Sequence, residues 1–378
     1  MNWEEKCLNE LGTISRGKSK HRPRNDPALY GGAYPFIQTA DVKNANFYIT
    51  EYSQTYNEKG LSQSKLWEKG TLCITIAANI ADTGILGIDA CFPDSIMGFI
   101  SYEDKSDVRY VKYCFDILQK QCQQISQGAT QDNLSWEKLS TIKFPCPPIE
   151  IQKKIADILS AYDDLIENNQ KQIKLLEEAA QRLYKEWFVN LRFPGHETTP
   201  ITDGVPQGWK RVTLGNIAPI LTGKKDANFG TEDGAYPFFT CSQEPIKAPS
   251  YSFDTSAVIL AGNGDFNVKL YRGKFEAYQR TYVLSSAEEK YLYLLYNAVN
   301  ESMAVLVKGA SGSTIKFLTK GMIESIPLFV PTDKLLEQYN CYSEAVQQKL
   351  ECLKKSIKIA TEARDRLLPK LMSGELEV

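Results

Sequence analysis

Residues 145–188 read PCPPIEIQKKIADILSAYDDLIENNQKQIKLLEEAAQRLYKEWF. After the prolines at 145, 147 and 148, about forty residues contain neither glycine nor proline, each of which destabilises a helix interior. Apolar residues recur every three or four positions in two columns: Leu159, Ile166, Ile173, Ala180, Trp187, and Ile155, Tyr162, Asn169, Leu176, Leu183. The pattern predicts one long helix with a heptad seam, in which Asn169 is a lone polar residue that fixes register.

So narrow a seam needs a partner helix, and we therefore predict a coiled coil. The alternative is an ordinary bundle helix, but helices in globular proteins average only ~11–12 residues.

The composition indicates a soluble globular protein. The 378 residues are enough for two or three domains, and the acidic start lacks the apolar core of a signal peptide. No apolar run approaches the ~18–20 residues of a membrane span. Nine cysteines without a C-x-x-C pair, and only two histidines, predict a reduced, cytoplasmic protein with no structural zinc site. A net charge of −2 leaves nucleic-acid binding open.

The chain contains an internal repeat. Gly32–Phe36 (GAYPF) recurs as Gly234–Phe238, and Gly17-Lys18 recurs as Gly223-Lys224. A second heptad seam follows near the end of the chain: Leu350, Ile357, Arg364, Leu371 beside Tyr339, Val346, Leu353, Ala360, Leu367. The chain is therefore predicted to duplicate one unit, a globular domain followed by a long helix.

Both globular units read as mixed α and β structure. Strands are predicted at 71–77, 96–102 and 257–261, and an amphipathic helix at 107–125. Ser286 and Glu289 form a capping-box pattern that would open a further helix.

The predicted fold is α+β, with two mixed α/β globular domains and two long helices in an antiparallel coiled coil, related by a pseudo-twofold axis. The predicted boundaries are 1–145 for the first domain, 146–190 for its helix, 191–208 for a linker, 209–330 for the second domain and 331–378 for the second helix and tail. Helices of this length would extend ~60 Å. Two similar domains at opposite ends would suit a two-part target such as duplex DNA, whose half-sites on one face lie ~34 Å apart.

The residues Gly12-x₄-Gly17-Lys18-Ser19 match the phosphate-loop pattern. That loop needs a buried strand before it and a helix after it. The preceding residues are charged and the following KHRPRNDP does not favour a helix. We therefore interpret the match as accidental.

Cations alternate at Arg16, Lys18, Lys20, Arg22 and Arg24. In an extended segment they would share one face and contact phosphates, and the alternative is a solvated loop.

Polar clusters also recur at corresponding places in the two halves. Asn, Gln and Arg read base edges bidentately, although each alone is more often a loop cap or turn residue. The predicted DNA-binding residues are Arg16, Lys18, Lys20, Arg22, Gln38, Thr39, Asn79, Gln131, Lys224, Lys225, Asn263, Asn267, Arg280, Lys308, Ser313 and Lys316. The paired Tyr-Pro-Phe segments are interpreted as core.

No catalytic constellation is evident. The sequence has no Asp/Asn-Pro-Pro-Tyr/Phe tetrapeptide and no credible glycine-rich cofactor loop. This favours a protein that reads its target without chemistry.

The chain resembles the specificity subunits of type I restriction-modification systems along essentially its whole length. The similarity is carried by residues 128–135 (GATQDNLS), 147–152, 163–169 (DDLIENN), 187–195, 206–209, 277–282 (AYQRTY) and 367–376. One departure is Val330-Pro331-Thr332-Asp333, which lacks the double proline and Glu-Gln of the first copy.

The resemblance implies a non-catalytic subunit whose two domains each read half of a bipartite DNA site, with helices that set the spacer and dock two methyltransferase subunits. The residues expected to contact those partners are Asp163, Glu167, Asn168, Tyr184, Trp187 and Phe188. The chain would carry no cofactor. S-adenosylmethionine, ATP and Mg²⁺ would be bound by partner subunits, including translocase–endonuclease subunits.

Two other classes stay open from the sequence: a nucleic-acid-modifying or ATP-dependent enzyme that uses the Gly12 loop, and an assembly scaffold that binds only proteins.

Overall fold

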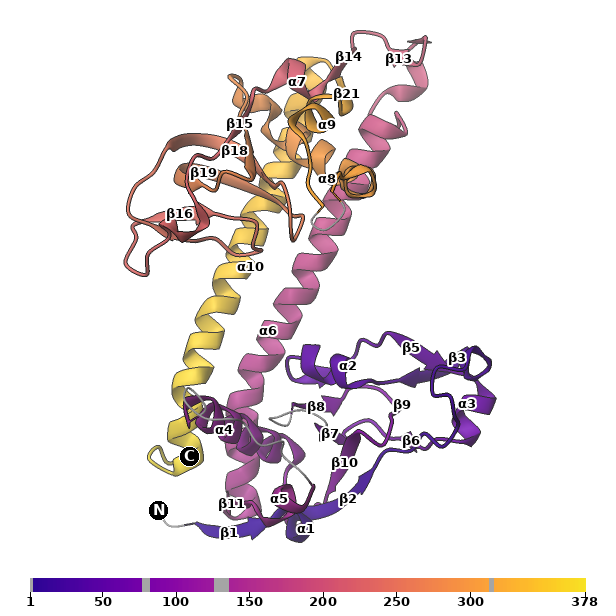
Figure 1. The fold of residues 1–378 in the computed structure, drawn as a ribbon, viewed down its shortest axis with the longest axis vertical. Helices are drawn as coiled ribbons and strands as arrows, with labels where there is room; N and C mark the ends of the chain where they lie inside the picture. Colours follow the sequence, from indigo (N-terminus) through magenta and orange to yellow (C-terminus); the bar gives the residue numbers. More distant parts are fainter. Residues whose placement is uncertain (1–2, 77–81, 126–135, 313–315) are drawn as a thin grey trace. The chain divides into compact units, whose positions relative to one another are not determined.

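The computed structural model describes residues 3–76, 82–125, 136–312 and 316–378, with the backbone alone described at 120–125 and 136–138 (Figure 1). Contacts divide the chain into two compact units. The first contains Met1–Lys171 and Leu353–Val378, and the second contains Gln172–Cys352. Each long helix therefore contributes to both units, which differs from the predicted division into successive segments.

The first unit is a mixed α/β domain. Its central sheet has the order β2 (Gly12–Arg16), β10 (Ile96–Ser101), β7 (Leu72–Thr75), β8 (Thr83–Leu86), β4 (Tyr48–Ile49). A second sheet has the order β5 (Gln54–Tyr56), β3 (Tyr30–Phe36), β9 (Ala90–Cys91), β6 (Leu66–Trp67), and β1 (Glu4–Cys7) pairs with β11 (Lys143–Cys146). The helices are α1 (Leu8–Leu11), α2 (Thr39–Asn44), α3 (Glu58–Ser62), α4 (Val108–Ile125) and α5 (Trp136–Thr141).

The second unit has a six-stranded sheet in the order β15 (Ile220–Thr222), β20 (Thr281–Leu284), β18 (Phe253–Ala261), β19 (Val268–Ala277), β16 (Tyr236–Phe239), β17 (Ile246–Ala248). Strand β14 (Lys210–Thr213) pairs with β21 (Pro327–Val330), and α7 (Leu214–Ile217), α8 (Leu292–Gly309) and α9 (Lys320–Glu324) complete the domain. Helix α8 packs on β18 and β19.

The topology confirms the predicted repeat. In each unit the first strand (β1 or β14) pairs with the last strand before the long helix (β11 or β21). A short helix, α1 or α7, follows that first strand along the chain. A sheet edge comes next, in which the order β2-β10-β7 matches β15-β20-β18. The two Tyr-Pro-Phe segments lie on β3 and β16, where Phe36 and Phe238 are buried, as expected of core residues.

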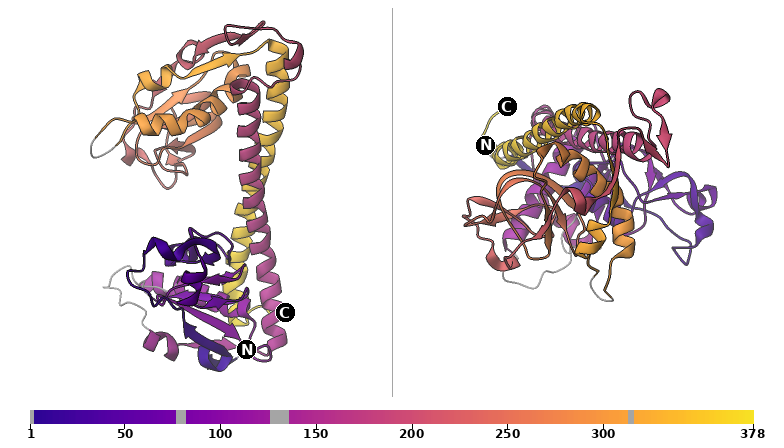
Figure 2. Two further views of the ribbon diagram at one scale, coloured as in Figure 1. Left: turned by 90° about the vertical axis from the view of Figure 1, so that its right-hand side faces the viewer. Right: turned by 90° about the horizontal axis from the view of Figure 1, so that it is seen from above.

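The long helices are α6 (Ile149–Tyr184), which ends in a π-helical turn at Lys185–Val189, and α10 (Asp333–Ser373). Within each unit they run side by side (Figure 2). In the first unit Asp163 meets Arg364 and Asn169 meets Ser356, so the two helices are antiparallel there. In the second unit the rings of Trp187 and Phe188 pack on Tyr339. Many residues of the predicted seams are buried: Ile155, Leu159, Ile166, Asn169, Trp187, Tyr339, Leu350, Leu353, Ala360 and Leu371.

One local prediction is wrong, and the predicted linker has some structure of its own. Ser286 and Glu289 form no capping box, because the Ser286 hydroxyl donates to the Ile217 carbonyl at 3.1 Å and Glu289 accepts from Ser256 at 2.9 Å. The 191–208 stretch is not purely a linker. It contains the hairpin β12 (Ile201–Thr202) and β13 (Val205–Pro206), and its Phe193 ring packs on Trp209.

Candidate nucleic-acid interface

Four loops of the second unit are joined to one another by hydrogen bonds. We call residues 223–226, 240–243, 262–267 and 278–281 the loop platform. Backbone N–H groups of Gly223, Gln279 and Gly262 donate to the carbonyls of Thr281, Lys225 and Arg280 at 3.1, 2.9 and 2.9 Å. These bonds place Lys224, Lys225, Asn263, Asn267 and Arg280, which are far apart in sequence, in one region of the surface.

The segment that follows α8 joins the platform. The N–H of Leu318 donates to the Gly262 carbonyl at 2.8 Å, and Phe317 forms bridges with Asn263 and Ser311. Lys316 therefore lies beside the platform, while Lys308 is in the last turn of α8.

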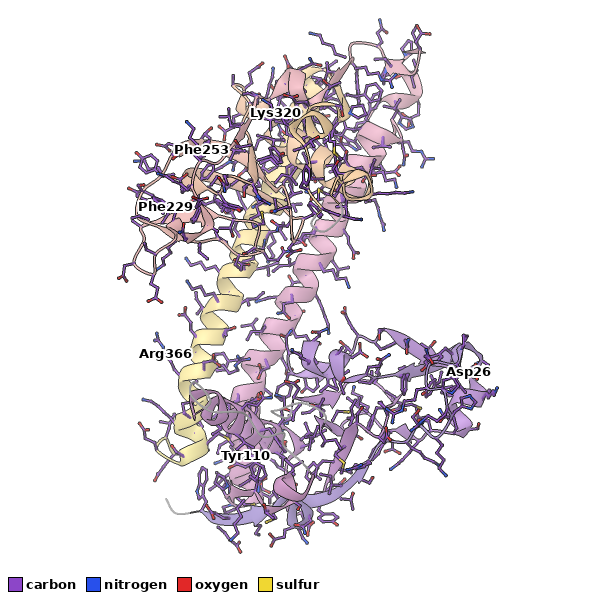
Figure 3. All side chains as sticks on the ribbon, viewed as in Figure 1. Asp26, Tyr110, Phe229, Phe253, Lys320 and Arg366 are labelled. Atoms are coloured by element: carbon purple, nitrogen blue, oxygen red, sulfur yellow. The ribbon has the colours of Figure 1, made fainter. Side chains whose placement is uncertain are left out.

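Several cations in or near the platform have no partner among the residues that the structure describes. Lys224, Arg280, Lys308 and Lys316 are exposed, and within the described part of the chain their side chains form no ion pair or hydrogen bond. Lys225 lies over the ring of Phe229 at 4.4 Å, and Figure 3 shows Phe229 among the loops near β16. Free cations on a loop surface are suited to phosphate contact.

The two platform asparagines are engaged within the protein. The thiol of Cys241 donates to Asn263 Oδ1 at 2.9 Å, and Asn267 Nδ2 donates to the carbonyls of Cys241 and Asp265 at 3.0 and 2.6 Å. Lys269 Nζ donates to the Ser242 carbonyl at 2.7 Å and to Asn267 Oδ1. Cys241 and Lys269 were not among the predicted site residues, and no sequence pattern marks them because their role arises only from loop contacts.

In the first unit the equivalent glycine and lysine occupy an equivalent position. Gly17 N–H donates to the carbonyl of Ile96 at the start of β10, at 2.9 Å, just as Gly223 donates to Thr281 at the start of β20. Lys18 N–H donates to Phe92 and Ile37 N–H donates to Cys91, so Lys18 and the Gln38–Thr39 start of α2 flank residues 91–92. Gln38 Nε2 donates to Gln54 Oε1 at 2.7 Å.

The five alternating cations, Arg16, Lys18, Lys20, Arg22 and Arg24, do not share one face as predicted. β2 ends at Arg16, and the Arg22 guanidinium turns back to donate to the carbonyls of Ser19 and His21 at 2.7 and 2.8 Å. Arg24 pairs with Asp94 at 2.6 Å. The segment is therefore not one extended strand, and Arg16, Lys18 and Lys20 are its cations whose side chains lack a partner in the described structure.

The phosphate-loop match is accidental, as interpreted from the sequence. Gly12–Arg16 is strand β2, and the N–H groups of Gly17 and Lys18 donate to protein carbonyls instead of facing an open cradle. Three predicted DNA-binding residues, Asn79, Gln131 and Ser313, lie outside the described residues.

Most residues predicted to contact protein partners are buried here. Asp163 accepts from Tyr113 at 2.6 Å and from Arg364 at 2.5 Å, and burial raises the pKa of Asp163. Tyr184, Trp187 and Phe188 belong to the core of the second unit, while Asn168 is exposed and Glu167 half-buried, paired with Lys171. Their assignment as partner contacts stays a prediction.

No candidate metal centre is found among the residues that the structure places: no three His, Cys, Asp or Glu side chains converge. The cysteines whose side chains are described are free thiols. No described helix combines the length and apolarity needed to cross a membrane.

Comparison with known proteins gives a consistent family. The type I restriction modification DNA specificity domain matches residues 1–178 and 206–350. The chain is 26% identical to the type I restriction enzyme MjaIX specificity subunit of Methanocaldococcus jannaschii, over 100% of this chain and 94% of that protein. It is 38% identical to the EcoDI specificity subunit of Escherichia coli, over 46% of this chain and 39% of that one.

The fold is similar to the crystal structure of a type I restriction-modification S subunit from M. genitalium, with a TM-score of 0.65 and 16% identity. The similarity covers 98% of this chain and 96% of that one. The matched residues include both units. The chain therefore belongs to the family of type I restriction-modification DNA specificity domains, whose specificity subunits recognise DNA and are not catalytic.

Proposed function

We propose that each unit reads one half of a bipartite site in duplex DNA, and that the chain directs the type I complex in which it assembles to that site. The observation that carries this proposal is the repeated placement of an unpaired lysine, Lys18 or Lys224, after a glycine bonded to the first residue of an equivalent strand. Two similar surfaces with free cations suit two similar contacts with a phosphate backbone.

The long helices would set the gap between half-sites and dock two methyltransferase subunits. S-adenosylmethionine would be bound by those subunits, and ATP and Mg²⁺ by translocase–endonuclease subunits. Support comes from the helical seam that α6 and α10 share within each unit, because a continuous packed helix is a stiff spacer.

A map of modified adenines across the genome tests this proposal. We would compare cells with the gene intact or deleted, in both cases keeping the gene of the methyltransferase subunit. Loss of one two-part motif with a fixed gap is expected on deletion. Persistence of every motif in an otherwise active system would contradict the proposal.

A further inference from the structure

Arg280 is mounted on a short turn with fixed ends. The N–H of Thr281 donates to the Tyr278 carbonyl at 2.8 Å, which makes Gln279 and Arg280 the two central residues of the turn. Tyr278 N–H donates to the Phe239 carbonyl at 2.9 Å, and Thr281 is fully buried. The turn therefore holds the backbone of Arg280 in place.

The two central side chains of this turn are used differently. Gln279 Nε2 donates to Asp226 Oδ1 at 2.8 Å, which ties the turn to the loop that carries Lys224 and Lys225. The guanidinium of Arg280 is exposed and, among the described residues, has no hydrogen-bond or ion-pair partner. Its N–H donors therefore have no acceptor in the part of the chain that the structure describes, although the backbone that carries the side chain is held in place.

The loops around Arg280 are held together by hydrogen bonds from backbone and side-chain polar groups. Gly262 N–H donates to the Arg280 carbonyl at 2.9 Å, and Asn267 bonds the carbonyls of Cys241 and Asp265. Lys269 is half-buried, and burial lowers its pKa while it donates to Ser242. Asn267 and Lys269 thus have their polar atoms committed to the loops.

From this arrangement we propose that Arg280 is the specificity-determining residue of the second unit and reads a guanine in its half-site, with Asn267 and Lys269 as positioning residues. This inference rests on the proposed function. The planar guanidinium can donate two N–H groups to O6 and N7 of guanine in the major groove. A lysine supplies charge without this paired geometry, so Lys224 is suited to phosphate and Arg280 to a base edge.

The test is selection from a random duplex library by the full chain assembled with its methyltransferase subunits. Arg280→Lys keeps the charge and removes the paired donors. We expect its preference for guanine at one position of one half-site to fall about 10-fold or more, with the other half-site unchanged. The matched control Lys224→Ala should weaken binding to all sequences alike. Circular dichroism and thermal unfolding check that each variant is folded.

The positioning role is tested by a double-mutant cycle. Asn267→Ala should lower preference at the same base position. Combined with Arg280→Lys, it should cause no further loss of preference at that position, because both substitutions remove the same contact with the base. Losses that add, or that spread over the half-site, would overturn the positioning role.

Two outcomes would overturn the assignment of Arg280: an unchanged base profile in Arg280→Lys, or weakening that is uniform over all sequences. If Arg280→Lys does not fold, Arg280→Gln replaces it, with the same expected loss at one position. A wild-type complex without any sequence preference would instead overturn the proposed function. The two failures are therefore distinguishable.

Discussion

Lys18 and Lys224 are the residues for which the repeat makes a matched prediction. Each follows a glycine at an equivalent place, and neither side chain has a partner in the described structure. We expect Lys18→Ala and Lys224→Ala each to weaken binding to every duplex. Each should also reduce the slope of log affinity against log salt by about 0.9, the value for one phosphate contact.

The measurement is a salt titration of DNA binding by the assembled complex. Lys334→Ala, at an exposed position in the first turn of α10, is the control and should leave the slope unchanged. A slope equal to that of the wild type in both lysine variants would remove these residues from the interface.

The glycines before these lysines are predicted to be structural. A Cβ on Gly223 would overlap the carbonyl of Ala277, and one on Gly17 would overlap the carbonyls of Phe92 and Pro93. Gly223→Ala should therefore lower the free energy of unfolding of the second unit by about 1–3 kcal/mol, because backbone atoms must move.

Gly321 in α9 is the control for that change. Its Cβ would meet nothing within 4 Å, so Gly321→Ala should be neutral or stabilise by up to about 1 kcal/mol. Denaturant titration of the full chain compares the two. Equal effects from both substitutions would show that the close approach at Gly223 does not matter.

At the scale of elements, Arg272 of β19 links the sheet of the second unit to α10. Its guanidinium donates to Glu344 Oε2 at 2.9 Å, and the Tyr293 hydroxyl donates to the same carboxylate at 2.6 Å. The bonds from Arg272 and then Tyr293 lower the pKa of Glu344 from 4.5 to about 2. This stabilisation is present above about pH 4.5, and it is lost as pH falls toward about 2 because the carboxylate is protonated there.

We therefore expect protonation of Glu344 to lower the free energy of unfolding by about 1 kcal/mol between about pH 5 and pH 2. The value is small because the side chains of Glu344 and Arg272 are partly exposed to solvent. In Glu344→Gln this part of the pH dependence should be absent. Glu337→Gln, an exposed position on the same helix, should leave it intact. Denaturant titrations across this pH range give the comparison, and identical profiles for Glu344→Gln and wild type would contradict the assignment.

Periodicity in the sequence predicted the elements better than the site. The seams of α6 and α10 were predicted because heptad spacing is a local property. Asn169 is buried and donates to Ser356 at 3.0 Å, and Arg364, anomalous in the seam, is explained by its pair with Asp163. The prediction that Arg22 and Arg24 lie on one face with Arg16 was wrong. It assumed an extended segment, but β2 ends at Arg16, Arg22 donates to the Ser19 carbonyl and Arg24 pairs with Asp94.

The site was only partly predictable, for a physical reason. The repeated Gly-Lys led to the predictions for Lys18 and Lys224, and a polar cluster led to that for Arg280. Whether a polar side chain is free, however, depends on loops distant in sequence. Asn267 is held by carbonyls of residues 241 and 265, and Lys269 by Ser242. No spacing in the sequence encodes these contacts.

At the scale of the whole molecule, the proposed spacer role predicts the effect of helix length. Inserting one heptad into both α6 and α10 keeps each seam in phase and adds ~10 Å, which is ~3 base pairs of duplex. The gap of the methylated motif should lengthen by about that amount with both half-site sequences unchanged. Inserting the heptad into α6 alone should misalign the seams and lower stability. Adenine mapping gives the gap, and an unaltered gap in the double insertion would contradict the spacer role.

The division of α10 between the two units has a consequence for the effect of truncating mutations. Leu368, Leu371 and Met372 lie in the same hydrophobic core as Leu8 and Leu11. The last residues of α10 thus complete the unit with which the chain begins. A stop codon between the codons for residues 353 and 368 would remove Leu368, Leu371 and Met372 from this core and leave residues 172–352 whole. The defect would appear in the first unit, most of which is encoded upstream of the second unit.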